Sequence, residues 1–520
     1  MLTAISSIAM AAMSCPAQAQ TESAQPIAVE AQPLEEALVA IGRKFGVSIT
    51  APDALTQGKT APALSGVMTV DQALQRVLAG SGLTYRIADN GGFIITPGDT
   101  SSNEGQNLII VRGEGRARSL QETASSVSVT TEDDLAKRAG PQSLRSVLEA
   151  TPGVQFNAVN NDGPTVRGSD SSGAIGGSGI FVGGARGRTT LEIDGREANL
   201  TELAFGSTGT WDIKQIEVFV GPQTTNRGRN AVAGAFYIET NDPTQYYEAA
   251  GRVVVGNFDT KNYAGVLSGP IIQDQLAFRV AAEVTEHDSF VDLALPLAGG
   301  DTTNPFGDFG FDPRESPSTN IRAKLLLTPD AIPDLEAKLT FNYFDTRRPQ
   351  TELVDNARSG GRQINNPLFS IFTNEVYAGT LDLKYQLSDA FQLRNSTVYT
   401  DNTSVRLDSV PGSAGLFTEE LVNKFYIDYD DPNSRLSGLF GVYYLRSWQD
   451  ADLVIVPDVF EVLLDGNATS LGIFGEIDIP LTERLTLTTG LRYQRDDKDR
   501  SGGQPLLDIN FDQTFEAWLP

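Results

Sequence analysis

The stretch I-E-V-F-V-G-P-Q-T-T-N-R-G-R-N-A-V-A-G, residues 216–234, joins an apolar-rich run to a glycine-rich loop that carries two arginines. Such a loop invites a phosphate-binding interpretation. A phosphate loop, however, has the pattern G-x-x-x-x-G-K-[S/T] between a strand and a helix. Here the spacing from Gly221 to Gly228 is wrong, neither Lys nor Ser/Thr follows Gly228, and the next run is typical of a strand. The sequence therefore argues against a nucleotide site, and the glycines are expected to permit tight turns.

The composition excludes several classes of function. A net charge of −26 argues against a nucleic-acid-binding surface, because such a surface needs clustered Lys and Arg to neutralise phosphates. The chain has one histidine, His287, and one cysteine, Cys15, so neither a zinc site of the usual kind nor an intrachain disulfide can form. His287 stands in the polar run T-E-H-D-S, where we expect a solvated strand end or loop. We therefore expect no catalytic residue, no metal site and no cofactor.

The first residues indicate an exported protein. They carry no charge, and their apolar stretch ends in Ala17-Gln18-Ala19, the A-x-A pattern of a cleavage site. We therefore predict a signal peptide over residues 1–19. The basic segment that usually precedes the apolar stretch is missing, so the true start codon is expected upstream. A membrane anchor is the alternative, although the run is short for a span.

Residues 27–97 are predicted to form a compact α+β unit. Apolar residues recur at helical spacing in two runs, 34–45 and 70–78, and two strands flank the turn A-D-N-G-G. The unit, down to its opening I-A-V-E-A-Q-P-L-E-E-A-L, resembles the short N-terminal domain shared by secretins and TonB-dependent receptors. In receptors, the resemblance implies a periplasmic domain that contacts an anti-sigma regulator of the inner membrane. In secretins, it implies a part in ring assembly.

Residues 98–117 are predicted to be a linker that contains the run N-L-I-I-V-R-G. Four apolar residues between polar flanks predict an exposed strand without a partner, and strand addition to another protein would satisfy its backbone. The run resembles a TonB box, with its core at Leu108, Ile109, Ile110, Val111, Arg112 and Gly113. The alternative is an ordinary first strand of the next domain.

Residues 118–242 resemble the plug domain of TonB-dependent receptors. A helix pair is followed by P-G-V, by R-G, by a strand ending in D-G and by I-E-V-F-V-G-P. The matching residues are Pro152, Gly153, Val154, Arg167, Gly168, Asp194, Gly195, Glu217, Gly221 and Pro222. Inside an enclosing wall, Arg227 and Arg229 are expected to meet carboxylates. Val220 stands where many plugs have Arg, which argues against the usual charge lock at that position.

Residues 243–520 alternate apolar and polar positions over segments of about ten residues, the length of a tilted barrel strand. Short turns, predicted at Ser268-Gly269-Pro270 and Ser388-Asp389, are followed by long polar loops such as 299–317 and 347–367. Short turns on one side and long loops on the other are typical of an outer-membrane barrel. A soluble β-sandwich is the alternative.

The number of predicted strands is small for this kind of barrel. We count about eleven or twelve, whereas a barrel that holds a plug has about 22. The final run F-E-A-W-L-P resembles one found in the middle of the family's barrels. We therefore expect the chain to stop within the barrel. The predicted fold is mainly β: an incomplete transmembrane antiparallel β-barrel, an α+β plug and a small α+β N-terminal domain.

The order of these parts resembles a TonB-dependent receptor of the outer membrane with its N-terminal domain in the periplasm. The resemblance implies a protein embedded in outer-membrane lipid that is not an enzyme. It implies import of a scarce ligand, powered by TonB and its inner-membrane energising complex, with transcriptional signalling through residues 27–97. A ferric siderophore is the first expectation, ahead of glycans and cobalamin. The alternatives of another class are a secretin-like structural pore subunit, which would lack the plug motifs, and a secreted carbohydrate-active enzyme, which would show turnover.

Overall fold

The computed structural model divides the chain into two compact units, Met1–Asn107 and Leu108–Pro520. It describes residues 25–97 and 110–519, with gaps inside these ranges. The longer gaps are 88–92, 157–162, 172–180, 182–186, 223–230, 294–310, 350–362 and 365–369. The predicted signal peptide therefore lies outside the described residues. Within the described ranges, no helix is long and apolar enough to cross a membrane.

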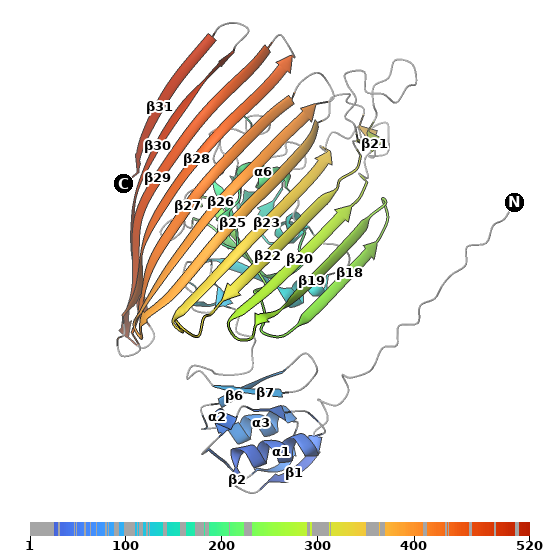
Figure 1. Ribbon diagram of the computed structural model, residues 1–520, viewed down its shortest axis with the longest axis vertical. Helices are drawn as coiled ribbons and strands as arrows, with labels where there is room; N and C mark the ends of the chain where they lie inside the picture. The colour runs from blue at the N-terminus through green and yellow to red at the C-terminus, as the bar shows by residue number, and fades with distance from the viewer. Residues whose placement is uncertain are drawn as a thin grey trace, which may run out of the picture. The chain divides into compact units, whose positions relative to one another are not determined.

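The first unit contains three helices, of which α1 and α3 are amphipathic, and three small sheets (Figure 1). The helices are α1 (Leu34–Phe45), α2 (Asp53–Thr56) and α3 (Val70–Leu78). Two of the sheets are strand pairs: β1 (Gln25–Val29) with β5 (Leu64–Met68), and β2 (Gln32–Pro33) with β4 (Thr60–Ala61). The third sheet has the strand order β3 (Ile49–Thr50), β7 (Phe93–Pro97), β6 (Leu83–Ile87). The apolar stripes of α1 and α3 are buried in one common core, as their helical spacing predicts.

The second unit begins with the region that resembles a plug, built on a five-stranded sheet. The strands run in the order β10 (Val127–Thr131), β16 (Ile213–Val220), β17 (Gly234–Thr240), β14 (Thr189–Ile193) and β15 (Arg196–Glu197). Three short helices, α4 (Glu132–Ala136), α5 (Leu144–Glu149) and α6 (Leu200–Phe205), accompany it. Thr131 and Asp134 form a capping box that satisfies the first backbone donors of α4. Two minor sheets are formed by β8 (Ile110–Val111) with β9 (Arg118–Ser119), and by β11 (Val154–Gln155), β12 (Thr165–Val166) and β13 (Ser169–Asp170).

A twelve-stranded antiparallel sheet, here called the wall, curves around this region (Figure 1). Its strands follow chain order: β18 (Glu248–Val255), β19 (Lys261–Ile272), β20 (Leu276–Glu286), β22 (Ser318–Leu327), β23 (Leu335–Pro349), β25 (Ser370–Ser388), β26 (Phe391–Asp408), β27 (Ser413–Asp430), β28 (Ser437–Val456), β29 (Phe460–Thr482), β30 (Leu485–Gln504) and β31 (Ile509–Leu519). A parallel pair of strands, β21 (Asp292–Leu293) with β24 (Gln363–Ile364), is not part of this sheet. The predicted strand count agrees with this sheet.

The outer face of the wall is apolar, and its inner face carries polar residues together with apolar clusters such as Val398, Val422 and Tyr443. On β23, the outward Leu339 and Phe341 are 50% and 46% exposed, whereas the intervening Thr340 and Asn342 are buried. Exposed apolar residues that alternate with buried polar residues, as on this strand, are typical of a wall with lipid outside and protein or water inside. It confirms the predicted fold class, mainly β with an α+β plug region.

Two predictions about the strands were wrong in detail. Ser268-Gly269-Pro270 is not a turn but part of β19, because these residues pair with residues 277–279 of β20. The Tyr247 ring packs against Gly269, where a Cβ would lie 2.3 Å from it, and its hydroxyl donates to the Pro270 carbonyl at 2.9 Å. The turn comes later, where Asp274 adopts a φ of 60°. Several strands also exceed the predicted length, since β29 has 23 residues. Pairing continues past the apolar belt because it still satisfies the backbone groups.

Candidate functional site

Strand β16 of the plug region presents two different faces. Since side chains alternate along a strand, Ile216, Val218 and Val220 lie on one face, and they are buried in the main core of the plug region. Residues 215, 217 and 219 lie on the opposite face. There Phe219 packs in a separate small cluster, with Ala231, Ala235 and Tyr237 of the plug region and with Val111.

Val111 brings the predicted TonB box to this second face. The box, residues 108–113, is here called the coupling segment; Leu108, Ile109 and Arg112 lie outside the described residues. Strand β8, Ile110–Val111, pairs with β9, and Val111 is 1% exposed. The sequence predicts an exposed strand without a partner. That expectation is wrong for these two residues, because the plug region itself covers them.

Two described hydrogen bonds join the coupling segment to the plug region, and a third links the two plug side chains that make them. The backbone N–H of Gly113 donates to Oε2 of Glu217 at 2.7 Å. The Gln215 side-chain amide donates to the Ile110 carbonyl at 3.1 Å and to Oε1 of Glu217 at 2.6 Å. Glu217 is 2% exposed. A buried carboxylate is costly unless hydrogen bonded, and here each of its oxygens accepts a bond.

The other plug motifs meet at the end of the same strand. Pro152-Gly153-Val154 and Arg167-Gly168 come together because β11 pairs with β12, and the Arg167 N–H donates to the Gly153 carbonyl at 2.8 Å. Gly153 has a φ of 87° and Gly221, before Pro222, a φ of 134°, which only glycine adopts readily. The glycines of these motifs therefore form the turns of the plug region.

Asp194 and Gly195, the D-G motif, face the wall instead. Oδ1 and Oδ2 of Asp194 accept from the N–H and the hydroxyl of Thr240 at 2.9 and 2.6 Å. Oδ2 also lies 3.5 Å from Nζ of Lys324 and 4.0 Å from Nε of Arg322, both on wall strand β22. Burial would raise the pKa of Asp194, but Lys324, Arg322 and the Thr240 bonds outweigh it and hold that pKa below its ordinary value. The carboxylate is therefore charged.

Further ion pairs, again with the carboxylate on the plug side and the cation on the wall, join the plug region to the wall. Asp212, between α6 and β16, accepts two bonds from Arg279 of β20. Glu192 lies 2.8 Å from Lys424. Asp242, just after β17, lies 3.3 Å from Lys324 and 3.0 Å from Lys338. These pairs place the carboxylates on the plug side and the cations on the wall.

This polarity differs from the one predicted. The expectation put plug arginines against wall carboxylates at Arg227 and Arg229, which lie outside the described residues. Of the described pairs, Arg118 has the predicted polarity, at 2.9 Å from Glu476 and 2.8 Å from Asp478. Val220, where many plugs have Arg, is 8% exposed in the plug core. Sequence reasoning missed Asp212, Asp242 and all the wall cations, whose only signal is a charge at an inward position of an alternating strand.

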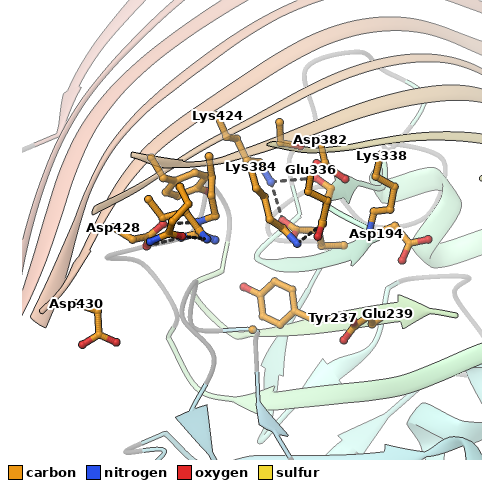
Figure 2. Close-up of a pocket in the computed structure, with 18 of the residues that line it drawn as sticks. Asp194, Tyr237, Glu239, Glu336, Lys338, Asp382, Lys384, Lys424, Asp428 and Asp430 are labelled. Carbon is orange, nitrogen blue, oxygen red and sulfur yellow. Dashed lines mark hydrogen bonds and ion pairs between the residues drawn. The ribbon is translucent and has the colours of Figure 1, made fainter. Parts of the chain in front are cut away.

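A cavity of about 820 Å³ lies between the plug region and the wall (Figure 2). Tyr237, Glu239 and Asp194 line it from the plug region, and Lys338, Asp382 and Lys424 are among its lining residues on the wall. Gly113 of the coupling segment also lines it. The coupling segment therefore ends where the plug region and the wall enclose space. In the described part of the chain, no group of His, Cys, Asp and Glu side chains is arranged to hold a metal ion.

Comparison with known families identifies this architecture. The family models described as Secretin and TonB N terminus short domain, TonB-dependent Receptor Plug Domain, and TonB dependent receptor-like, beta-barrel match residues 47–98, 119–235 and 320–520. The chain belongs to the TonB-dependent receptors. The plug region is thus a plug and the wall is a barrel sheet of this family.

Relatives of this TonB-dependent receptor include proteins named for ferric siderophores. The chain is 24% identical over 297 residues to the ferric-pyoverdine BN7/BN8 receptor of Pseudomonas putida, an alignment that covers 53% of this chain and 34% of that protein. It therefore spans about a third of the length of this curated relative. The ferric yersiniabactin uptake receptor FyuA of Yersinia pestis has a similar fold, with a TM-score of 0.61, 18% identity and coverage of 76% of this chain and 60% of that one. The ferripyoverdine receptor of the outer membrane of Pseudomonas aeruginosa gives a TM-score of 0.59 at 14% identity, over 94% and 67%.

Proposed function

We propose that this TonB-dependent receptor imports a ferric siderophore across the outer membrane, using energy that TonB delivers through the coupling segment. The observation that carries the proposal is the position of Val111 and Gly113. They attach the segment to the plug sheet beside the plug–wall cavity. A pull on the segment therefore acts directly on β16, the second strand of the five-stranded sheet.

The relatives support the choice of ligand. The names of the Pseudomonas putida, Pseudomonas aeruginosa and Yersinia pestis proteins refer to pyoverdine and yersiniabactin complexes of iron. The plug–wall interface combines buried ion pairs with an apolar cluster, in which Phe181 and Ala204 of the plug pack with Phe372 of the wall. Movement of the plug would have to break both kinds of contact, which is consistent with an energy supply from TonB.

A second role belongs to the N-terminal unit, which has a hydrophobic core of its own. We propose that residues 27–97 lie in the periplasm and report ligand binding to an anti-sigma regulator of the inner membrane. The match of residues 47–98 to the short domain shared with secretins supports this assignment. Deletion of residues 27–97 at the chromosomal locus is expected to leave ferric-siderophore uptake intact and to abolish ligand-induced transcription. Loss of uptake with normal folding and export would contradict this role.

Transport itself is tested by deleting the gene and measuring uptake of labelled ferric siderophores under iron limitation. We expect iron starvation to induce the protein and the deletion strain to lose uptake of one siderophore class, with glycan and cobalamin uptake unchanged. Unchanged siderophore uptake, or selective loss of glycan or cobalamin uptake, would reject iron import. Complementation with the gene restored at its locus is the control.

A further inference from the structure

The coupling segment approaches the plug more closely than a side chain at position 113 would allow. A Cβ on Gly113 would lie 2.2 Å from Cε2 of Phe219, 2.4 Å from Cδ2 of Tyr237 and 2.7 Å from Oε2 of Glu217. Two of these neighbours are rings packed edge to face, with centroids 5.4 Å apart, in the buried cluster that also holds Val111. Glycine at this position is therefore a requirement of the docked state.

Glu217 is the centre of the polar contacts in that state. Its Oε2 accepts from the Gly113 N–H, and its Oε1 accepts from the Gln215 amide group. The same Gln215 nitrogen donates to the Ile110 carbonyl. Glu217 therefore contacts the coupling segment directly at Gly113 and, through Gln215, at Ile110.

We propose that Glu217 is the positioning residue that keeps the coupling segment docked on the plug, with Gly113 as its required partner. The inference rests on the proposed coupling to TonB and adds the contact that determines how readily the segment becomes available to TonB. TonB would bind the segment as an added strand, whereas in the docked state Ile110 and Val111 pair with β9 and the Ile110 carbonyl also accepts from Gln215. Undocking would free the Ile110 carbonyl and the Gly113 N–H for pairing with an added strand.

Glutamine at position 217 is a sharp test of this arrangement because it has the same shape. A carboxylate accepts on both oxygens, whereas a carboxamide accepts on one and donates from the other. An amide NH₂ placed toward Gln215 or Gly113 would face another donor. Gln215 could relieve this by turning its amide over, but it would then lose its bond to the Ile110 carbonyl. In every arrangement Glu217→Gln removes one bond that holds the segment.

The test measures how often the segment leaves the plug. Cys15 lies in the predicted signal peptide, so a cysteine introduced by Val111→Cys is the only one in residues 20–520. In the docked state this side chain is buried. A membrane-impermeant maleimide is added to outer-membrane fragments, without siderophore and without TonB. We expect Glu217→Gln to raise the labelling rate by roughly tenfold, the effect of losing a hydrogen bond to a charged group.

Glu239→Gln is the matched control. Glu239 lies on β17 beside the same cavity and pairs with Lys214 at 2.9 Å, and no described bond joins it to the segment. We expect its labelling rate to stay within roughly twofold of the reference, because its ion partner is Lys214 and not a residue of the segment. Gly113→Ala is the second variant. It changes only the segment and should raise labelling as Glu217→Gln does.

An unchanged labelling rate in Glu217→Gln with a protease-resistant plug would overturn the proposal. If Glu217→Gln loosens the plug itself, Gly113→Ala decides: fast labelling supports the docked geometry and slow labelling rejects it. Neither result depends on the imported ligand. If the receptor imports another ligand, this measurement still tests the role of Glu217. If Glu217 is not the positioning residue, the proposal of siderophore import is unaffected.

Discussion

Asp194 of the plug lies 3.5 Å from Lys324 of the wall, and both side chains are almost completely buried. Removing one partner of a buried ion pair costs about 3–5 kcal/mol. The lower value applies here, because Lys324 keeps Asp242 at 3.3 Å as a second partner. We therefore expect Asp194→Asn to lower the free energy of unfolding of the plug by about 3 kcal/mol. The measurement is the urea dependence of maleimide labelling at Val147→Cys, a side chain that is 1% exposed in the plug core.

An exposed carboxylate on the same domain provides the control. Glu149 of α5 pairs with Arg145 one helical turn earlier, at 3.0 Å, and its side chain is 44% exposed. Glu149→Gln should change plug stability by less than about 0.5 kcal/mol, because surface pairs are screened by water. Equal shifts for the two variants would mean that the Asp194–Lys324 contact does not hold the plug.

The lowered pKa of Asp194 predicts how this stability depends on pH. Burial raises the pKa, but Lys324, Arg322 and Thr240 lower it further, so the folded value lies below the unfolded value of about 3.9. A carboxylate of this kind contributes stability above its unfolded pKa and loses it as the pH falls through the folded pKa. Urea midpoints of the plug should therefore separate Asp194→Asn from the reference most at neutral pH, and the difference should shrink below about pH 4. A gap that stays constant down to about pH 2 would contradict the charged state.

The plug sheet could be predicted from the sequence because its information is local. The run I-K-Q-I-E-V-F-V places apolar residues at 216, 218 and 220, and the structure buries them together in the plug core. The same alternation puts Gln215 and Glu217 on the other face. Polar residues at 215 and 217 indicate a solvent-facing side, so the sequence did not predict that Val111 and Gly113 cover this face.

The plug–wall contacts could not be predicted in the same way. Arg279 and Asp212 are 67 residues apart, and their meeting depends on how the wall curves around the plug. Alternation indicates that Arg279 points inward, but no local pattern tells which carboxylate it meets. At Gly269 a local pattern gave a wrong prediction. The S-G-P run is typical of a turn, but in the structure it lies within β19 beside Tyr247, a contact that only the folded sheet creates.

Proline at position 111 should separate ligand binding from transport. Val111→Pro removes a backbone donor and fixes φ, so the segment can no longer pair as a regular strand with TonB or with β9. We expect siderophore binding to whole cells to be retained and uptake to fall to background. Val111→Ala, which keeps the N–H, should retain most uptake. Normal uptake by the proline variant would exclude this segment as the site of TonB coupling.

The outer face of the wall provides the last prediction. Leu325, Leu339 and Leu381 are directly opposite one another on β22, β23 and β25, and they are 40%, 50% and 40% exposed. In contact with lipid, an arginine among them would cost about 2–4 kcal/mol near the middle of the membrane, and about 0–1 kcal/mol near its edge. In contact with water, the same change would be harmless.

We therefore expect Leu339→Arg, introduced at the chromosomal locus, to reduce the amount of heat-modifiable protein in outer-membrane fractions several-fold. Leu481→Arg is the matched control, because Leu481 is 56% exposed but lies one residue before the end of β29, beside the last pair that this strand forms with β30. It should assemble nearly as well as the unmodified protein. If the two variants assemble equally well, the leucine row does not face lipid, and this face of the wall is in contact with water instead.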